Sequence, residues 1–347
     1  MKIVVVADQY MPSSVFERAL APLAAEHELR FFQVRDGNGF VPKTPSERAI
    51  RECAATPQEV VGYLCDEEVL VVHGAPVTDA VLEVSPNLAL VCCARGGPVN
   101  VDLAAAARRG IRVVTTPGKN AEAVADLTLG LLIMLARGLP QAMRFVSTRG
   151  NVGQSTFEGA RFLGRDLAEH VVGIVGYGQV GTRVARRVLA CGMKILVFDP
   201  WIENARIDGE GIRACELDEL LARSDFVSLH ARDSLENADL FNRERFQAMR
   251  RGAYFVNTAR ETLVDEDALC DALLSGHLAG AALDVVRPRA DDGPHPLAAL
   301  ENVILTPHIG GATHETLQRG ARMVAEEIRR FAADVPLVNV IRHEACR

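Results

Sequence analysis

A glycine-rich segment carries the strongest chemical signal in the sequence. Gly176, Gly178 and Gly181 form the pattern G-x-G-x-x-G directly after an apolar run, with Gln179 and Val180 between the last two glycines. In this pattern the first glycine permits a tight turn and the second lets the backbone approach a pyrophosphate. The third lets the following helix pack closely on the strand. The pattern alone is weak evidence, because many tight turns share it.

An acidic residue after the next apolar run strengthens this interpretation. The run Lys194–Phe198 ends directly before Asp199, at about the distance expected for a ribose-binding acid. A carboxylate there accepts hydrogen bonds from ribose hydroxyls and repels a 2′-phosphate, and no arginine stands beside it. The residues therefore predict a dinucleotide site that prefers NAD over NADP.

Length and charge narrow the class of protein. The 347 residues suggest one large or two medium domains, and 48% of them are hydrophobic, as in ordinary globular proteins. The net charge of -7 argues against a nucleic-acid partner, because phosphate backbones select positive surfaces. It does not argue against a small anionic substrate, since one local arginine can bind a carboxylate.

The apolar runs and the cysteines indicate where in the cell the protein lies and whether it binds a metal ion. The N-terminal apolar run is too short for a signal peptide, and the longest apolar stretch, 127–136, is too short to cross a bilayer. The eight cysteines form no C-x-x-C pair, and none has a histidine at a zinc-site spacing. We therefore expect reduced thiols in a cytoplasmic protein, with no metal site and no membrane partner.

Elements that position these residues alternate along the chain. Short β-branched runs and helical patterns follow one another throughout, which is typical of α/β folds with doubly wound parallel sheets. We expect strands near 3–7, 29–34, 69–73, 88–93, 112–115, 171–175, 194–198, 226–229, 253–257, 280–283 and 303–305. We expect helices near 13–26, 79–84, 102–109, 121–137, from 178, and near 217–223, 243–249, 265–275 and 313–332. The helix 121–137 is apolar on nearly every face, which predicts burial between domains or subunits.

Several further motifs occur in a fixed order along the chain. They are Asn100–Asp102, Thr116–Ala125, the glycine pattern, Val256–Arg260, Ala281–Val285 and Thr306–Thr313. With them the sequence resembles the D-isomer-specific 2-hydroxyacid dehydrogenase family over most of its length. The resemblance implies a flavodoxin-like substrate domain from residues 1–118 and 310–347, and a Rossmann NAD-binding domain from residues 119–309. It also implies an active site between them and a homodimer that uses helix 121–137.

The resemblance implies hydride transfer between NAD and a small 2-hydroxy acid or its 2-oxo acid. Reduction of the oxo group builds negative charge on oxygen, so the site needs a proton donor and a fixed positive charge. The resemblance makes His308 the proton donor, and Arg260 the group that holds the carboxylate and polarises the carbonyl. On chemistry alone, His308 is equally well a loop residue bonded to backbone. A surface salt bridge is the alternative for Arg260.

Further cofactor contacts follow from the resemblance. Asp284 would bind the nicotinamide carboxamide. Thr258 and His230 would contact the cofactor from neighbouring strand ends, together with Thr128 and Arg260.

The resemblance also implies a carboxylate-binding loop at Arg95, Gly96, Gly97 and Asn100. Backbone N–H groups of such a loop can form an anion nest. A plain turn is the alternative.

The sequence departs from the family pattern beside the expected proton donor. The family usually has a glutamate five residues after the position of Asp284, where it pairs with the catalytic histidine, but Arg289 stands here. A carboxylate would stabilise the imidazolium of His308, and an arginine would do the reverse. Three outcomes are open. Asp291, Asp292 or Glu261 replaces the missing acid, or Arg289 binds a second anionic group of the substrate. In the third outcome, turnover is lost. The last outcome leaves open an NAD(H)-sensing interaction protein of the same fold.

Overall fold

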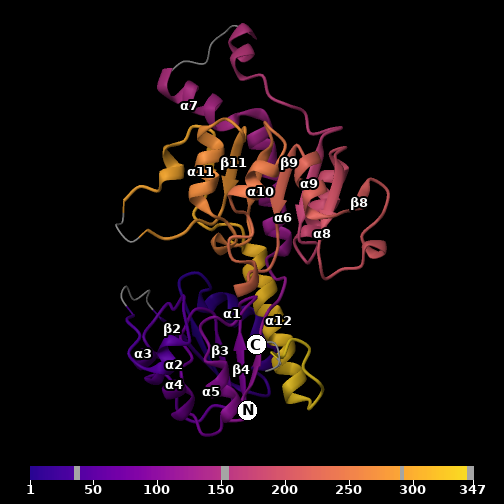
Figure 1. Ribbon diagram of the computed structural model, residues 1–347. Helices are drawn as coiled ribbons and strands as arrows, with labels where there is room; N and C mark the ends of the chain where they lie inside the picture. The colour runs from indigo at the N-terminus through magenta and orange to yellow at the C-terminus, as the bar shows by residue number, and fades with distance from the viewer. Residues whose placement is uncertain (35–39, 150–155, 290–292, 342–347) are drawn as a thin grey trace. The chain divides into compact units, whose positions relative to one another are not determined.

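Two compact units make up the computed structural model, which describes residues 1–34, 40–149, 156–289 and 293–341 (Figure 1). The first unit contains residues 1–119 and 313–347, and the second contains residues 120–312. The family resemblance places these boundaries after residues 118 and 309. Each unit has one parallel sheet, with helices packed on its faces, so the predicted fold class is confirmed.

The first unit is built on a five-stranded sheet in the order β2-β1-β3-β4-β5. Residues of β1 alternate between two apolar clusters, with Ile3, Val5 and Ala7 in one and Val4 and Val6 in the other. Both faces of the sheet are therefore buried under helices, as parallel sheets require. The strands are β1 Lys2–Ala7, β2 Glu28–Gln33, β3 Val69–Val72, β4 Leu90–Cys93 and β5 Arg112–Val114. The helices are α1 Ser13–Leu20, α2 Pro45–Arg48, α3 Pro57–Val61, α4 Asp79–Glu83, α5 Leu103–Arg108 and α12 His314–Ala332.

The second unit is built on a seven-stranded sheet in the order β12-β11-β10-β9-β6-β7-β8. Here too, apolar clusters lie on both faces of the sheet. The strands are β6 Val171–Val175, β7 Lys194–Phe198, β8 Ile212–Ala214, β9 Phe226–Leu229, β10 Tyr254–Asn257, β11 Gly280–Leu283 and β12 Val303–Leu305. The helices are α6 Ala121–Arg137, α7 Leu139–Arg149, α8 Gly181–Ala190, α9 Leu217–Arg223, α10 Arg243–Ala248 and α11 Glu266–Leu274.

Several elements differ from the sequence-based expectation. The first helix ends at Leu20 and continues only as a 3-10 turn, because Pro22 cannot donate to an α-helical ladder. Helices α2 and α3 are single turns that begin after Thr44 and Thr56, and helical periodicity cannot reveal elements this short. Helix α7 and the short edge strand β8 were also not expected.

The apolar helix α6 forms part of the core of the second unit. It packs on α8 and on strands β10 and β11 of its own unit. Leu131, Leu132 and Leu135 are buried in the cluster on that face of the sheet, whereas Ile133 is 38% exposed. Core packing therefore explains part of its apolar character, and its predicted place at an interface between domains or subunits stays a prediction.

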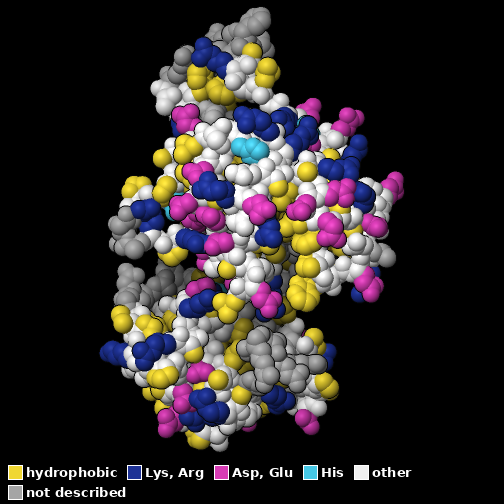
Figure 2. Space-filling view, in the orientation of Figure 1, with side chains coloured by type: hydrophobic (Ala, Val, Ile, Leu, Met, Phe, Trp, Pro, Cys, Tyr) yellow, Lys and Arg dark blue, Asp and Glu magenta, His cyan; other side chains and the backbone are white. Residues whose placement is uncertain are grey.

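Two further observations concern surface and length. Figure 2 shows acidic and basic side chains intermixed over the visible face of each unit. None of the described helices alone has the length and apolar character needed to cross a membrane. Helix α6 and residues 139–148 of α7 meet that test only as a pair, with a bend of 67° between them.

Candidate functional site

The residues that could bind a ligand or take part in a reaction lie at the carboxyl ends of the strands in each sheet. In open α/β sheets, ligands bind at this edge where the strand order reverses. That point lies between β1 and β3 in the first unit and between β6 and β9 in the second. Gly176 follows β6 and His230 follows β9, and the His230 N–H donates to the Val175 carbonyl (2.7 Å).

The glycine pattern has three different local geometries. Gly176 has a φ of 93°, and a Cβ there would lie 2.6 Å from the Ala231 nitrogen. A Cβ on Gly181 would lie 2.1 Å from the Gly176 carbonyl oxygen, so a side chain would push α8 off the sheet. A Cβ on Gly178 would meet nothing within 4 Å. The first and third glycines are thus required by packing, whereas Gly178 leaves open space beside its backbone.

Asp199 is tied to the glycine loop. Its two carboxylate oxygens accept hydrogen bonds from the Tyr177 N–H (2.8 Å) and from the Trp201 N–H (2.9 Å). A carboxylate has about four acceptor sites, so ribose hydroxyls can still donate to it. With Gly178 and Gln179 exposed and α8 beginning after Val180, these residues fit the phosphates and ribose of a dinucleotide.

A chain of polar side chains links three elements beside the glycine loop. The His230 ring contacts the Ser228 hydroxyl through Nε2 (2.8 Å) and the Thr258 hydroxyl through Nδ1 (3.5 Å). The hydroxyls of Thr258 and Thr128 are 3.1 Å apart, and Thr128 also donates to the Val124 carbonyl (2.8 Å). Burial lowers the pKa of His230 to about 3, so this ring is neutral. Thr128 is fully buried and contacts Thr258, and its expected contact with a cofactor stays a prediction.

Arg260 lies in the turn that follows β10. The Asn257 side chain shapes this turn, because its oxygen accepts from the Ala259 N–H (2.9 Å) and its nitrogen donates to the Arg260 carbonyl (3.0 Å). Arg260 itself is exposed, and its guanidinium donates to the Ala259 carbonyl (2.6 Å). Its charge is thus available at the carboxyl edge of the sheet.

Asp284 holds the loop that carries His308. One carboxylate oxygen accepts from the Thr306 hydroxyl (2.6 Å) and from the Ile309 N–H (2.8 Å). The other accepts from the Gly310 N–H (2.7 Å), and the Asp284 carbonyl accepts from the His308 N–H (2.9 Å). These bonds cross 22 to 26 residues of sequence, and nothing in the sequence pattern indicated them. They make Asp284 a positioning residue for His308; its expected contact with the nicotinamide remains a prediction.

The missing acid next to His308 has no replacement among the described residues. His308 is exposed, with a φ of 55°, and its ring has no carboxylate partner in the described part of the chain. Glu261 lies in a 3-10 turn after Arg260, and no bond joins it to His308. Arg289 is exposed, and Asp291 and Asp292 lie outside the described residues. The three hypotheses for this position therefore remain open.

The expected carboxylate-binding loop follows β4 in the first unit. Arg95 forms an ion pair with Glu52 and also donates to the Glu52 carbonyl (3.2 Å). Gly96 and Gly97 are exposed, but neither has a positive φ, so the loop lacks the αR–αL form of an anion nest.

Asn100 is fully buried, and its amide donates to the carbonyls of Ala75 (2.7 Å) and His73 (3.1 Å). The expected substrate contact of Asn100 stays a prediction. This residue ties the loop after β4 to the loop after β3.

The loop that begins at His73 is one in which we expect contacts that choose the substrate, but the polar cluster that His73 joins at the switch point of the first sheet was not expected. Asp8 follows β1 and is buried, and its Oδ2 accepts from His73 Nδ1 (2.8 Å) and from the Gly74 N–H (2.7 Å). Lys119 is buried too, and its ammonium donates to the Ala94 carbonyl (2.6 Å). Burial lowers the pKa of Lys119 to about 8. A polar residue directly after a buried strand was the available signal for Asp8 and His73.

Comparison of the sequence with known protein families identifies the family to which this arrangement belongs. Residues 129–310 match the family described as D-isomer specific 2-hydroxyacid dehydrogenase, NAD binding domain. The chain belongs to this family. The match covers the glycine loop and both strand ends that carry Arg260 and Asp284, and it confirms NAD as the cofactor.

Individual relatives agree with this assignment. A glyoxylate reductase of Korarchaeum cryptofilum is 36% identical over 304 residues, covering 87% of this chain and 88% of the relative. A D-3-phosphoglycerate dehydrogenase of Archaeoglobus fulgidus is 34% identical over 285 residues, and this match covers 53% of the relative. The chain thus spans about half the length of that dehydrogenase. A solved structure from Thermus thermophilus has a TM-score of 0.78 and 32% identity, covering 99% of this chain and 100% of that one.

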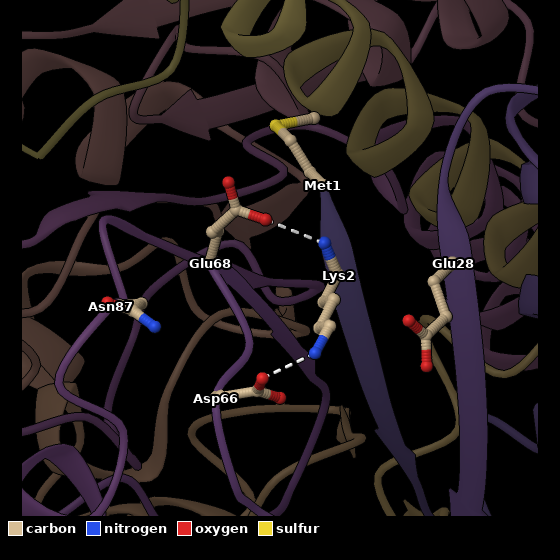
Figure 3. Close-up of a pocket in the computed structure, with 6 residues that line it drawn as sticks. All are labelled: Met1, Lys2, Glu28, Asp66, Glu68 and Asn87. Atoms are coloured by element: carbon tan, nitrogen blue, oxygen red, sulfur yellow. Dashed lines mark hydrogen bonds and ion pairs between the residues drawn. The ribbon is translucent and has the colours of Figure 1, made fainter.

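One large pocket lies away from these strand ends. It measures about 650 Å³ and lies at the amino edge of the first sheet, where Lys2 bonds to Glu68 through its backbone nitrogen and to Asp66 through its ammonium (Figure 3). Glu28 and Asn87 also line it. None of the predicted site residues lines this pocket, so it carries no argument about the dehydrogenase site. Among the described residues, no group of three His, Cys, Asp or Glu side chains is placed to hold a metal ion.

Proposed function

We propose that the chain is an NAD-dependent oxidoreductase that transfers a hydride between the nicotinamide and a small 2-hydroxy acid or its 2-oxo acid. The observation that carries this proposal is the arrangement of the ends of β10 and β11. These strands are neighbours, and the Asp284 N–H donates to the Asn257 carbonyl (2.9 Å). The loop with Arg260 and the tether that holds His308 therefore begin side by side.

Each residue then has a defined task. The cofactor held by the glycine loop and Asp199 would supply a hydride as NADH in reduction and would take one up as NAD⁺ in oxidation. Arg260 binds the substrate carboxylate through its planar fork and places positive charge beside the oxygen that becomes negative. His308 gives that oxygen a proton in reduction and removes it in oxidation. Asp284 keeps the His308 loop in one conformation, so that the proton donor need not be ordered at each turnover.

We propose two sets of contacts for this reaction. The proposed cofactor contacts are Gly176, Gly178, Gln179, Val180, Gly181, Asp199, His230, Thr258, Arg260, Asp284 and Thr128. The proposed substrate contacts are Arg95, Gly96, Gly97, Asn100, Arg260 and Arg289. We further propose a cytoplasmic homodimer. The seven described cysteines are free thiols, which supports a reducing compartment.

The test is NADH oxidation by the purified chain with a panel of short 2-oxo acids. The panel contains glyoxylate, pyruvate, hydroxypyruvate and a phosphorylated homologue. We expect turnover with at least one member, a loss of about 100-fold or more in kcat for His308→Asn, and little change for His314→Asn. His314 is an exposed histidine at the start of α12 and serves as the matched control. Tight NADH binding without turnover on any member would contradict the enzyme and favour an NAD(H)-sensing protein.

A further inference from the structure

A chain of hydrogen-bonding side chains runs across the ends of β9 and β10 to α6. Ser228 lies in β9, His230 follows that strand, and Thr258 follows β10, its neighbour in the sheet. Thr128 comes from α6, which packs on β10. Each hydroxyl has only one hydrogen to donate, so the direction of every bond in the chain can be deduced from one end.

The direction is fixed first at α6. The Val124 carbonyl can only accept, so the Thr128 hydroxyl donates its single hydrogen to that oxygen (2.8 Å). The contact between the hydroxyls of Thr128 and Thr258 (3.1 Å) then takes its hydrogen from Thr258. Because that hydrogen is used, Thr258 can only accept from His230 (3.5 Å), and Nδ1 of the ring must carry the hydrogen.

The other end of the chain gives the same direction. The His230 ring is neutral, because burial lowers its pKa to about 3, so only one ring nitrogen carries hydrogen. With hydrogen on Nδ1, Nε2 accepts from the Ser228 hydroxyl (2.8 Å). Ser228 is fully buried, and its hydroxyl has no other hydrogen-bond partner among the described residues. The opposite direction would leave the Ser228 hydrogen without an acceptor, which is costly for a buried group.

The direction of these bonds leaves Thr258 with one free acceptor position and no free hydrogen. A hydroxyl oxygen can accept two hydrogen bonds, and His230 supplies one of them. Thr258 keeps 8% of its surface exposed, whereas Thr128 and Ser228 keep none. A ligand at this edge of the sheet therefore meets an acceptor. A group with N–H or O–H is favoured there, and a group that offers only an oxygen is disfavoured.

The order of the strands indicates which part of the cofactor lies here. In the proposed site, the ribose of the adenosine lies at Asp199 after β7, and the pyrophosphate lies at the glycine loop after β6. The strands on the other side of β6 are β9 and then β10. A dinucleotide that spans such a sheet extends its nicotinamide half over these strand ends. The nicotinamide ring carries a carboxamide, which has both an N–H2 group and an oxygen.

We infer that Thr258 accepts a hydrogen bond from the N–H2 group of the nicotinamide carboxamide, and that Thr128 on α6 fixes the direction of this bond. This inference rests on the cofactor contacts of the proposed function and deepens them. Thr128 is a positioning residue in this arrangement, because it acts through Thr258. Together they select cofactors with a donor on the ring substituent over analogues that have only an acceptor.

The experiment compares dissociation constants of NADH and of reduced acetylpyridine adenine dinucleotide, whose acetyl group has an oxygen but no N–H. We expect the wild-type chain to bind NADH about 10-fold or more tightly, because the acetyl oxygen faces an acceptor. Thr128→Val frees the Thr258 hydrogen to donate to the acetyl oxygen. The preference should then fall to about 2-fold or less, through tighter binding of the analogue.

Two further variants separate this effect from a loss of packing. Thr128→Ser keeps the hydroxyl and should keep the preference of the wild-type chain. Thr148→Val is the matched control, because Thr148 also donates to the carbonyl four residues earlier, but on the exposed helix α7. It should leave both dissociation constants unchanged. Thermal melting of each variant controls for folding.

A second measurement locates the hydrogen on His230 directly. Heteronuclear NMR of isotope-labelled histidine should show it on Nδ1 in the wild-type chain, with the signal assigned by its absence in His230→Gln. Hydrogen on Nε2 would overturn the inference, even if Thr128→Val does not fold.

Three binding results would also overturn it. They are an equal affinity of the wild-type chain for the two cofactors, an unchanged preference in Thr128→Val, and an equal weakening of both cofactors in that variant, which a structural role alone would produce. Because the test measures binding, a chain that binds NADH but reduces no 2-oxo acid contradicts the proposed reaction and not this inference. A chain that does not bind NADH contradicts both.

Discussion

His308 adopts a left-handed backbone conformation that a non-glycine residue rarely takes. A φ of 55° costs on the order of 1 kcal/mol relative to the right-handed region. The surrounding bonds to Asp284 maintain this conformation: four donors from residues 306–310 converge on its carboxylate and carbonyl. We interpret this strain as the cost of fixing the proton donor in one position.

Replacing the Asp284 carboxylate tests this interpretation. Asp284→Asn puts an amide donor among N–H donors, so we expect a loss of about 2 kcal/mol in unfolding free energy and a fall in kcat of about 10-fold or more. Urea unfolding and steady-state kinetics measure the two effects. Asp265→Asn is the matched control, because Asp265 caps α11 and asparagine caps helices equally well. Equal changes in unfolding free energy and kcat in the two variants would contradict the positioning role of Asp284.

His230 predicts a specific dependence of stability on pH. Its folded-state pKa of about 3 lies below the unperturbed value of about 6.5. Unfolded chains therefore bind a proton that the folded chain rejects, and stability falls as the pH drops from about 6.5 towards 3. Between pH 7 and pH 4.5 the wild-type chain should lose about 2 kcal/mol more than His230→Gln, as measured by urea unfolding at each pH. Parallel pH profiles of the two proteins would contradict the neutral buried ring.

At the scale of elements, substitutions at two glycines of the glycine loop test cofactor binding and helix packing separately. Gly178→Ala should leave the melting temperature unchanged, because nothing lies within 4 Å of the added Cβ, but it should weaken NADH binding by about 10-fold or more. Gly181→Ala should lower the melting temperature, because its Cβ meets the Gly176 carbonyl. Gly209→Ala, which adds a Cβ in equally open space, is the control for binding. Unchanged NADH affinity in Gly178→Ala would show that the loop does not approach the cofactor.

Elements also show what a sequence can and cannot reveal. Period and composition identified both sheets, because buried parallel strands are continuous apolar runs. Single-turn helices such as α2 span only about one helical period, so no apolar repeat reveals them and they were missed. The tether from Asp284 and the pairing of Asp8 with His73 were missed for another reason. The first spans 22 to 26 residues and the second 65, so both depend on strand order, which one sequence does not display.

At the scale of the whole molecule, the exposed face of α7 is where we place the dimer contact. Leu139, Met143 and Val146 have exposed fractions of 38%, 66% and 39%, and their spacing places them on one side of the helix. Adjacent exposed apolar residues of this kind usually mark a protein contact. We therefore propose that this face, together with α6, forms the contact of the homodimer.

A charge on that face should separate the two subunits. We expect the wild-type chain to elute with twice its 37.6 kDa mass in light scattering, and Met143→Asp to elute as the monomer. Leu235→Asp is the control, because Leu235 is fully exposed and lies outside this helix. A monomeric wild-type chain, or a dimer that persists in Met143→Asp, would contradict this contact.

A single-turnover experiment tests the central claim most directly. A slight excess of the chain is mixed with NADH and then with a large excess of hydroxypyruvate, while NADH absorbance and fluorescence are followed together. We predict that fluorescence reports binding in both the wild-type chain and His308→Asn, and that absorbance decays at least 100-fold more slowly in the variant. Binding of NADH by the wild-type chain without any decay of absorbance, or equal decay rates in both proteins, would contradict the account.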